Sequence, residues 1–542
     1  MSRVEQRAFE RRWWILAVLC FSLLVIVLDN SILNVAIPTI IKELDATNSQ
    51  IQWIIDAYTL SFAGLLLTAG SLGDRFGRRP ALQVGFVIFG LGSVASALVG
   101  SADHLIMTRT LMGVGGAVIM PATLSIITNV FPPEERGQAI GVWAGVAGLG
   151  AALGPLAGGF LVEHFYFGSV FLVNVPIVIF GLVTGFLLIP NSKDPHAPRV
   201  DAVGAILSVA GLTLLLFAII EAPGDGWAST KILLTMAAGV VISVAFVLWE
   251  RHSDHPMLDV SFFRNPRFSA ASGSIAVIFF AMFGSIFLLT QYFQFVLDYS
   301  PFGTGIRMLP FAGSLMLFAP LSAVFVKWVG TKFTVATGMA LVAVGLVTMS
   351  NFTVTSSYGS IVWRLMLVAA GMGMTMAPAT DSVMGSLPLA KAGVGSAVND
   401  TTRQVGGALG VAVIGSIMAS IYGDKVAHFL STLGAPEQAI DAARNSLGGA
   451  AQVAADPRAP ASLGQELMRT ANQAFVDAMH RGYLLAAAMA VVGVLIALLF
   501  LPSRASQEDL DMQLGEWVAE ARAADDLSPL TKEVPRSGPG HP

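Results

Sequence analysis

The chain alternates between long apolar runs and short polar segments over most of its length. Fourteen runs reach about 20 mostly apolar residues, the length that a helix needs to cross the hydrocarbon core of a bilayer. Proline and glycine fall inside many of these runs, which membrane helices tolerate better than soluble ones. The pattern predicts an all-α polytopic membrane protein with 14 spans, at residues 13–37, 51–72, 81–101, 104–130, 138–162, 169–190, 202–221, 230–250, 268–292, 304–326, 334–353, 360–384, 394–420 and 481–502.

Basic side chains fall almost entirely on one side of the predicted spans. With the N-terminus inside, sixteen Lys and Arg lie in inner segments, and only Lys42 and Lys231 lie in short outer segments. Because basic loops stay in the cytoplasm, both termini are expected there. The long outer segment 421–480 is expected to form a helical hairpin or a mobile cap, with a simple loop insertion as the alternative. The tail 503–542 is expected to be disordered or to form a short surface helix.

Composition agrees with a membrane protein and excludes several functions. Of 542 residues, 54% are hydrophobic and 12% charged, against about 25% charged in soluble domains. The net charge of −4 argues against a nucleic-acid partner, and the one cysteine, Cys20, excludes an internal disulfide. The first apolar run is too long for a signal-peptide core. The sequence shows neither a Walker loop nor a cluster of metal ligands, so an enzyme, a cofactor or a metal is not expected.

A glycine- and arginine-rich segment lies between the second and third predicted spans: Gly70-Ser-Leu-Gly-Asp-Arg-Phe-Gly-Arg-Arg79. Its glycines predict a tight reversal of the backbone. Its single acid is expected to hydrogen-bond neighbouring arginines or to meet the positive end of a helix. The alternative is an ordinary turn whose arginines only mark the cytoplasmic side. The candidate conformational-switch residues here are Gly70, Gly73, Asp74, Arg75, Gly77 and Arg78.

The fifth predicted span is rich in glycine at intervals of four residues. Such spacing lines up small residues on one helix face and lets a neighbouring helix approach closely. A Gly-Pro pair inside the run also creates a point where the helix can bend. Tight packing without a role in transport is the alternative. The candidate switch residues in this span are Gly150, Gly154, Pro155, Gly158 and Gly159.

Three charged residues fall inside predicted spans at a similar depth. Asp29 lies within the first span, where an acid costs about 2.5–3.5 kcal/mol. Counting about 1.5 Å per residue places it in the outer third of the core, level with Asp56 and Arg109. Two carboxylates beside one guanidinium cannot both ionise cheaply, so one is expected to hold an exchangeable proton. The alternative is that Arg109 snorkels outward and Asp56 faces the outer water.

Two further sets of residues are candidates for substrate contact and for gating. Broad-specificity sites favour aromatic surfaces with few polar groups, although aromatic side chains that face lipid give the same pattern. The candidate substrate-binding residues are Trp53, Tyr58, Phe283, Phe287 and Gln291. A polar patch near the inner ends of spans twelve and thirteen is interpreted as an inner gate or structural latch; its residues are Asp381, Asn399, Asp400 and Arg403.

An internal repeat organises the spans. Pro-Ala-Thr recurs at 121–123 and 378–380, in the fourth and twelfth spans, which cross the membrane in the same direction. This predicts a parallel repeat of two six-helix bundles around a central cavity, with two extra helices inserted between them. The predicted organisation is a cytoplasmic N-terminus (1–12), an N-terminal bundle (13–190), a linker with two extra spans (191–267), a C-terminal bundle (268–502) and a cytoplasmic tail (503–542).

Together these motifs resemble the fourteen-span drug:proton antiporters of the major facilitator superfamily, the branch of multidrug efflux pumps, over residues 13–502. The chain departs from the family at Phe167-Gly-Ser169, where many members carry Trp-Arg-Trp, and at the degraded second-half loop Lys327-Trp-Val-Gly-Thr-Lys332.

The resemblance implies a monomeric bacterial protein of the plasma membrane. It would exchange protons for amphiphilic, often cationic, drugs by alternating access, driven by the proton gradient without a cofactor. Export of an endogenous lipid or secondary metabolite by the same fold is the first alternative. Solute uptake by symport, a membrane sensor and an intramembrane enzyme are further ones.

Overall fold

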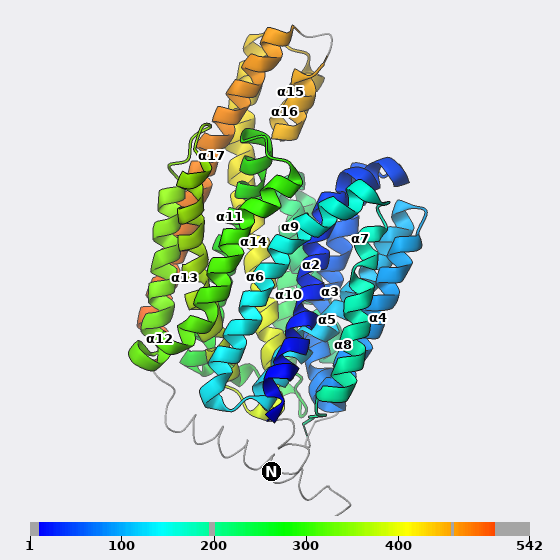
Figure 1. Ribbon diagram of the computed structural model, residues 1–542, viewed down its shortest axis with the longest axis vertical. Coiled ribbons are helices and arrows are strands. Elements are labelled where there is room, and N and C mark those ends of the chain that lie inside the picture. Colours follow the sequence, from blue (N-terminus) through cyan, green and yellow to red (C-terminus); the bar gives the residue numbers. More distant parts are fainter. Residues whose placement is uncertain (1–9, 195–200, 457–459, 504–542) are drawn as a thin grey trace, which may run out of the picture.

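The computed structural model describes residues 10–194, 201–456 and 460–503 of the chain. Within these residues the secondary structure is entirely helical, as the apolar runs predict. The helices form one elongated bundle, from which a narrower helical hairpin projects at one end (Figure 1). The end where α2 begins is called the inner end below, and the end with the hairpin is called the outer end.

The N-terminal bundle is built around one hydrophobic core, which includes Trp143, Phe86 and Phe89. Polar caps mark where its helices begin: the Thr47 side chain accepts from the backbone N–H of Gln50, and the Gln50 side chain accepts from that of Thr47. The helices are α2 (Arg12–Leu44), α3 (Asn48–Phe76), α4 (Arg78–Leu98), α5 (Ala102–Val130), α6 (Pro133–His164), α7 (Ser169–Leu172) and α8 (Asn174–Leu188).

Two helices, α9 (Ala202–Asp225) and α10 (Thr230–His252), separate this bundle from the next in the chain. Helix α9 packs against α3 and also against α14 of the C-terminal bundle. Side-chain hydrogen bonds lie at both contacts: Gln52 of α3 donates to Glu221 of α9 at 2.6 Å, and Trp227, just after α9, donates to Ser416 of α14 at 2.8 Å. Helix α9 therefore lies beside the seam between the two bundles, and α10 packs against α9.

The C-terminal bundle has a second hydrophobic core and lies on the other side of the seam (Figure 1). Its elements are η1 (Val260–Arg264), α11 (Pro266–Gln291), η2 (Tyr292–Val296), α12 (Pro301–Met349), α13 (Tyr358–Met384), η3 (Leu389–Lys391), α14 (Ala392–Thr432), α15 (Glu437–Asn445), α16 (Leu447–Ala454) and α17 (Ala461–Phe500).

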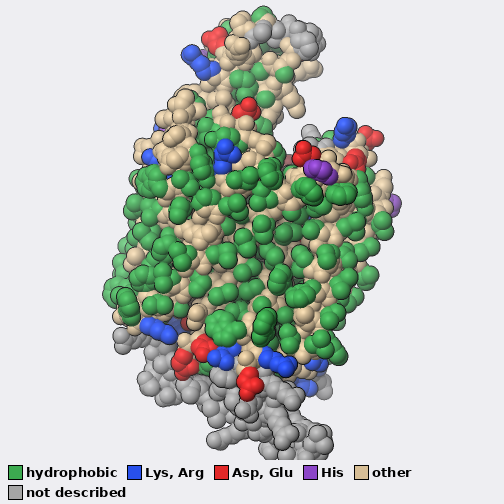
Figure 2. Space-filling model, viewed as in Figure 1, with side chains coloured by type: hydrophobic (Ala, Val, Ile, Leu, Met, Phe, Trp, Pro, Cys, Tyr) green, Lys and Arg blue, Asp and Glu red, His purple; other side chains and the backbone are tan. Residues whose placement is uncertain are grey.

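Thirteen of these helical segments are long and apolar enough to cross a membrane. The sequence predicts two spans, 304–326 and 334–353, where the structure has the single 49-residue α12. Two helices meet inside α12 at Gly330, whose φ of 84° and ψ of 166° are non-helical. Hydrophobic side chains cover the flank of the bundle, and charged ones gather toward its two ends (Figure 2). The molecule is a multi-pass membrane protein.

The outer hairpin differs from the predicted span limits. Helix α14 continues past residue 420 to Thr432, and α17 begins at Ala461 instead of near 481. Lys425 of α14 and Asp477 of α17 form an ion pair at 2.5 Å, which joins the two long helices. Most of segment 421–480 is therefore helical, as the prediction of a helical hairpin requires. The predicted cytoplasmic tail, after residue 503, lies outside the described residues.

Candidate transport site

A buried ion pair lies inside the N-terminal bundle. Asp29 of α2 and Arg109 of α5 approach to 2.5 Å, and both side chains are 1% exposed. The predicted span limits place Asp29 toward the outer end of the first span. Because α2 extends to Leu44, Asp29 instead lies near the middle of this 33-residue helix. A charge pair without water is stable only when the remaining polar atoms also find partners.

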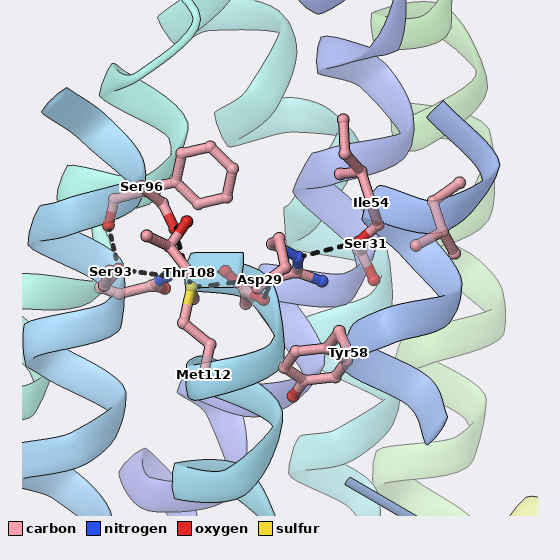
Figure 3. A network of polar contacts seen from close by, with 12 residues as sticks. Asp29, Ser31, Ile54, Tyr58, Ser93, Ser96, Thr108 and Met112 are labelled. Atoms are coloured by element: carbon pink, nitrogen blue, oxygen red, sulfur yellow. Dashed lines mark hydrogen bonds and ion pairs between the residues drawn. The ribbon is translucent and has the colours of Figure 1, made fainter. Parts of the chain in front are cut away.

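The second oxygen of Asp29 is also satisfied. It accepts a hydrogen bond of 2.8 Å from the side-chain amide of Asn174, at the start of α8. The same amide donates to Ser93 at 3.1 Å, and the Ser93 hydroxyl donates to the carbonyl of Phe171 at 2.7 Å. Figure 3 shows Asp29 and Ser93 within this polar network. Both carboxylate oxygens of Asp29 therefore have a donor.

Arg109 is held from two further directions. Its Nε donates to the carbonyl of Ile54 at 3.4 Å, and its guanidinium lies 4.2 Å from the centre of the Tyr58 ring. Ile54 and Tyr58 belong to α3 (Figure 3). Arg109 of α5 therefore links α3 with Asp29 on α2. The ring retains an attraction for the guanidinium whatever the charge of Asp29.

Asp56 does not join this pair. It hydrogen-bonds to Gln52 and faces the carboxylate of Glu221 on α9. In the part of the chain that the structure describes, no hydrogen bond or ion pair connects Asp56 with Arg109. Depth counting places the three residues at one level but does not fix their direction around each helix. Within the expected layer only Asp29 and Arg109 make a direct contact, and a role of Asp56 in holding a proton stays a prediction.

Asp74 joins the two bundles at the inner end. Its carboxylate accepts from the backbone N–H groups of Gly393 and Val394, at 2.8 and 3.0 Å, at the first turn of α14. It also pairs with Arg78 at 2.9 Å, and Arg78 donates to the carbonyl of Leu389 at 2.7 Å. A carboxylate at a helix N-terminus satisfies free N–H groups and the helix dipole. Both alternatives expected for Asp74 are therefore realised together.

The reversal of the chain is narrower than the sequence predicts. Gly70 and Gly73 lie within α3, which continues to Phe76, and only Gly77 adopts a positive φ, of 110°. Gly70 serves close approach instead: a Cβ there would lie 2.5 Å from the carbonyl oxygen of Gly393. Arg75 lies over the Phe76 ring at 5.4 Å.

The glycines of α6 contact two different helices. A Cβ on Gly150, Gly154 or Gly158 would meet α2, at 3.1, 2.1 and 3.2 Å respectively. Gly159 and Pro155 face α12 of the C-terminal bundle, near Phe302 and Gly305. Helix α6 thus packs closely on the helix that carries Asp29 and also reaches across the seam.

The inner polar patch divides into two groups. Asn399, Asp400 and Arg403 gather around Thr380, whose hydroxyl accepts from Arg403 at 3.0 Å and lies 3.3 Å from Asn399. Asp381 instead faces Arg136 and Arg267. Adjacent residues of one helix point in different directions, and so the patch is two sites.

The candidate substrate residues are not gathered in one place. Trp53 stacks on Phe217 of α9 at 6.0 Å, and Tyr58 lies buried under Arg109. Phe283 and Phe287 lie on α11 near Gly407 and Gly415 of α14. Gln291 donates to the carbonyl of Phe287 at 3.5 Å. Their contact with substrate stays a prediction.

Sequence reasoning missed several partners in these sites. Asn174 is a polar residue within an apolar run, and that position could have flagged it. The backbone donors of Gly393 and Val394 carry no side-chain signal and could not be predicted. Among the described residues, no group of three or more His, Cys, Asp or Glu could hold a metal ion.

The model of the Major Facilitator Superfamily matches residues 19–411 of this sequence. The chain belongs to the major facilitator superfamily. This family and the helical bundle point to a transporter and not to an enzyme.

Relatives of this major facilitator include drug exporters. It is 36% identical to the multidrug efflux pump LfrA of Mycolicibacterium smegmatis, over 90% of this chain and 97% of that protein. It is 32% identical to the tetracenomycin C resistance and export protein of Streptomyces glaucescens, over 90% of this chain and 91% of the relative. The fold resembles the crystal structure of the human organic anion transporter MFSD10, with a TM-score of 0.58 and 12% identity, covering 91% of this chain and 99% of that one. Membership in the drug-efflux class of the superfamily follows from these matches.

Proposed function

We propose that this protein is a monomeric, proton-coupled antiporter that exports amphiphilic, often cationic, compounds across the plasma membrane by alternating access. The buried Asp29–Arg109 pair is the observation that carries this proposal. The named activities of LfrA and of the tetracenomycin exporter support export as the direction. No cofactor takes part, and α12 crosses the membrane twice, which gives fourteen spans with both termini in the cytoplasm.

Protonation of Asp29 supplies the coupling. A neutral carboxyl group loses most of its attraction for the Arg109 guanidinium, which keeps its contacts with Ile54 and Tyr58. Helix α2 is then free to shift against α5. Because α2 also packs on Gly154 and Gly158 of α6, the shift passes to the helix that meets α12 across the seam.

The inner contact at Asp74 sets the second part of the cycle. In this conformation its carboxylate holds the start of α14 against the end of α3. Substrate that enters from the cytoplasm requires these ends to separate. Hydrogen bonds to a charged group contribute about 1.5–3 kcal/mol each, so this contact biases the protein toward a closed inner side.

The test is dye transport in inverted membrane vesicles with an imposed pH gradient. Asp29→Asn should abolish gradient-driven transport, because the amide keeps the shape of the side chain but cannot exchange a proton. Asp477→Asn in the outer hairpin is the matched control and should transport normally. Normal gradient-driven transport by Asp29→Asn would reject Asp29 as the coupling site.

A second candidate substrate is an endogenous secondary metabolite. The relative named as a tetracenomycin C resistance and export protein supports this possibility. Competition between the dye and organic-solvent extracts of the source cells, in the same vesicles, distinguishes the two. An extract that inhibits dye transport from the inner side would favour an endogenous substrate.

A further inference from the structure

The Arg403 guanidinium lies between two aromatic rings from different bundles. Its central carbon is 5.0 Å from the centre of the Trp143 ring on α6 and 5.3 Å from that of the Phe279 ring on α11. Both distances are within the range in which a ring face attracts a cation. Trp143 is fully buried, and Phe279 is nearly so. The three residues form an aromatic enclosure around a positive charge.

A carboxylate completes this enclosure, but it is held loosely. Asp400 is 2% exposed, and its Oδ1 lies 3.6 Å from Arg403 Nη1. The carboxylate lies near the Ser396 hydroxyl, but its Oδ2 has no hydrogen-bond partner among the described residues. The Nε atom of Arg403 and the indole N–H of Trp143 are likewise without a partner in the part of the chain that the structure describes.

Burying the polar atoms of Asp400, Arg403 and Trp143 without hydrogen-bond partners costs free energy. Buried polar atoms in native proteins nearly always have partners, and each exception calls for an explanation. An ion pair fixed only for stability is expected to satisfy both charges with good geometry. The arrangement around Arg403 meets neither expectation. It combines two ring faces with one incompletely used carboxylate, which is the chemistry that recognises organic cations.

We propose that Trp143, Phe279 and Asp400 form a binding site for an organic cation, and that Arg403 occupies this site in the present conformation as an internal substitute. The proposal rests on the proposed export function and names a place for the positive charge of the substrate. It gives Asp400 and Arg403 a role in recognition in place of the latch that the sequence suggested. The Asp29–Arg109 pair, on α2 and α5, is a separate site.

The location of the enclosure fits alternating access. Trp143 belongs to the N-terminal bundle, while Phe279 and Asp400 belong to the C-terminal bundle. Separation of the bundles would therefore open the enclosure and expose all three groups. A cation that enters would displace Arg403 and take over its contacts with the two rings and with Asp400.

Binding of tetraphenylphosphonium to the purified full-length protein tests the proposal without transport. Equilibrium dialysis in detergent gives the dissociation constant. Arg403→Gln removes the internal cation and should tighten binding by about tenfold, the scale of one desolvated cation–π contact. Arg403→Lys keeps the charge and should bind like the wild type. Asp400→Asn and Trp143→Leu should each weaken binding by about tenfold, also in the Arg403→Gln background.

Arg364 provides a matched control. Its guanidinium lies over two rings of the C-terminal bundle, Phe352 at 5.2 Å and Trp363 at 5.1 Å, but it forms no ion pair with a carboxylate among the described residues. Arg364→Gln should therefore leave the affinity unchanged. A gain in affinity cannot come from misfolding, so the Arg403→Gln measurement remains decisive even if Trp143→Leu is unstable.

The outcomes separate this site from the proposed function. Weaker or unchanged binding by Arg403→Gln overturns the proposal, as does wild-type affinity in both Asp400→Asn and Trp143→Leu. If binding follows the expected order but the vesicles show no gradient-driven export, the cation site stands and the proposed coupling fails. If the vesicles export dye but all variants bind tetraphenylphosphonium with equal affinity, the proposed cation site is rejected and the proposed export function stands.

Discussion

Two buried Asp–Arg pairs, one in each bundle, use the same residue types in different ways. Asp29 and Arg109 approach to 2.5 Å, and further partners bind the second carboxylate oxygen and the guanidinium Nε. Asp400 and Arg403 remain 3.6 Å apart, and the corresponding two atoms are unsatisfied among the described residues. Two buried Asp–Arg pairs can therefore differ in how completely their polar atoms are hydrogen-bonded, and burial alone does not indicate their function.

The difference follows from where the residues stand in the chain. Asp29 and Arg109 come from two helices, so the carboxylate and guanidinium can meet directly. Asp400 and Arg403 are three residues apart on α14, where neighbouring side chains lie along one face and meet at an angle. The first pair suits a switch that a proton opens. The second suits a charge that a ligand can replace.

The largest expected difference between the pairs is in transport. Asp29→Asn should abolish gradient-driven export of neutral and cationic substrates alike, because it removes the exchangeable proton. Asp400→Asn should lose cationic substrates only. Vesicle assays with one neutral and one cationic dye measure both. Equal loss of the two dyes in Asp400→Asn would break the distinction.

Stability should separate the pairs next. Removal of one partner from a well-satisfied buried pair costs about 3–5 kcal/mol, so Arg109→Gln should lower the thermal unfolding midpoint strongly. Arg403→Gln should lower the midpoint less, because the separation of 3.6 Å from Asp400 already forgoes part of the pairing energy. Thermal unfolding in detergent compares them. Similar unfolding midpoints for the two variants would contradict the conclusion that the polar atoms of the Asp29–Arg109 pair are more completely hydrogen-bonded.

The Asp74–Arg78 pair sharpens the comparison, because both of its side chains also hydrogen-bond to the C-terminal bundle. Asp74→Asn keeps the side-chain shape but loses the charge, and charge-assisted bonds are about twice as strong as neutral ones. We expect a wider inner opening, measured by distances between spin labels on the inner ends of α3 and α14, and about tenfold slower transport for a loss of about 1.4 kcal/mol. Asp441→Asn on the exposed α15 should change neither. An unchanged distance distribution would mean that Asp74 only caps the N-terminus of α14 and does not hold the inner side closed.

The last comparison is between two glycines of α3 that lie one turn apart. A Cβ on Gly70 would lie 2.7 Å from the Cβ of Ala397 on α14, whereas one on Gly73 would meet only the Cβ of Ala81 at 3.6 Å. Gly70→Ala should destabilise the closed inner side by about 1–3 kcal/mol. Gly73→Ala should be neutral or slightly stabilising, since alanine favours helix. Transport rates of the two variants, measured side by side, test this difference. Equal rates would mean that the close approach of α3 and α14 at Gly70 does not matter for transport.

The sequence by itself determined the helical membrane architecture and the residue types of the main sites. Apolar run length, basic loop segments and the repeated Pro-Ala-Thr are properties of the chain that no tertiary contact changes. The chemistry of a lone acid within a span or before a helix turn is likewise local. That is why the sequence alone marks Asp29, Arg109 and Asp74 as candidate functional residues.

Only the tertiary structure decided which of these groups meet. A residue count gives depth along a helix, but the direction of a side chain depends on how the helix is rotated against its neighbours. Asp56 therefore faces α9 and not Arg109, and Asp381 faces away from Asp400. The partners of Asp74 on α14 are backbone N–H groups about 320 residues away, and those of Arg403 are rings on two other helices. Such contacts arise from packing between distant segments, because no local pattern in the chain encodes them.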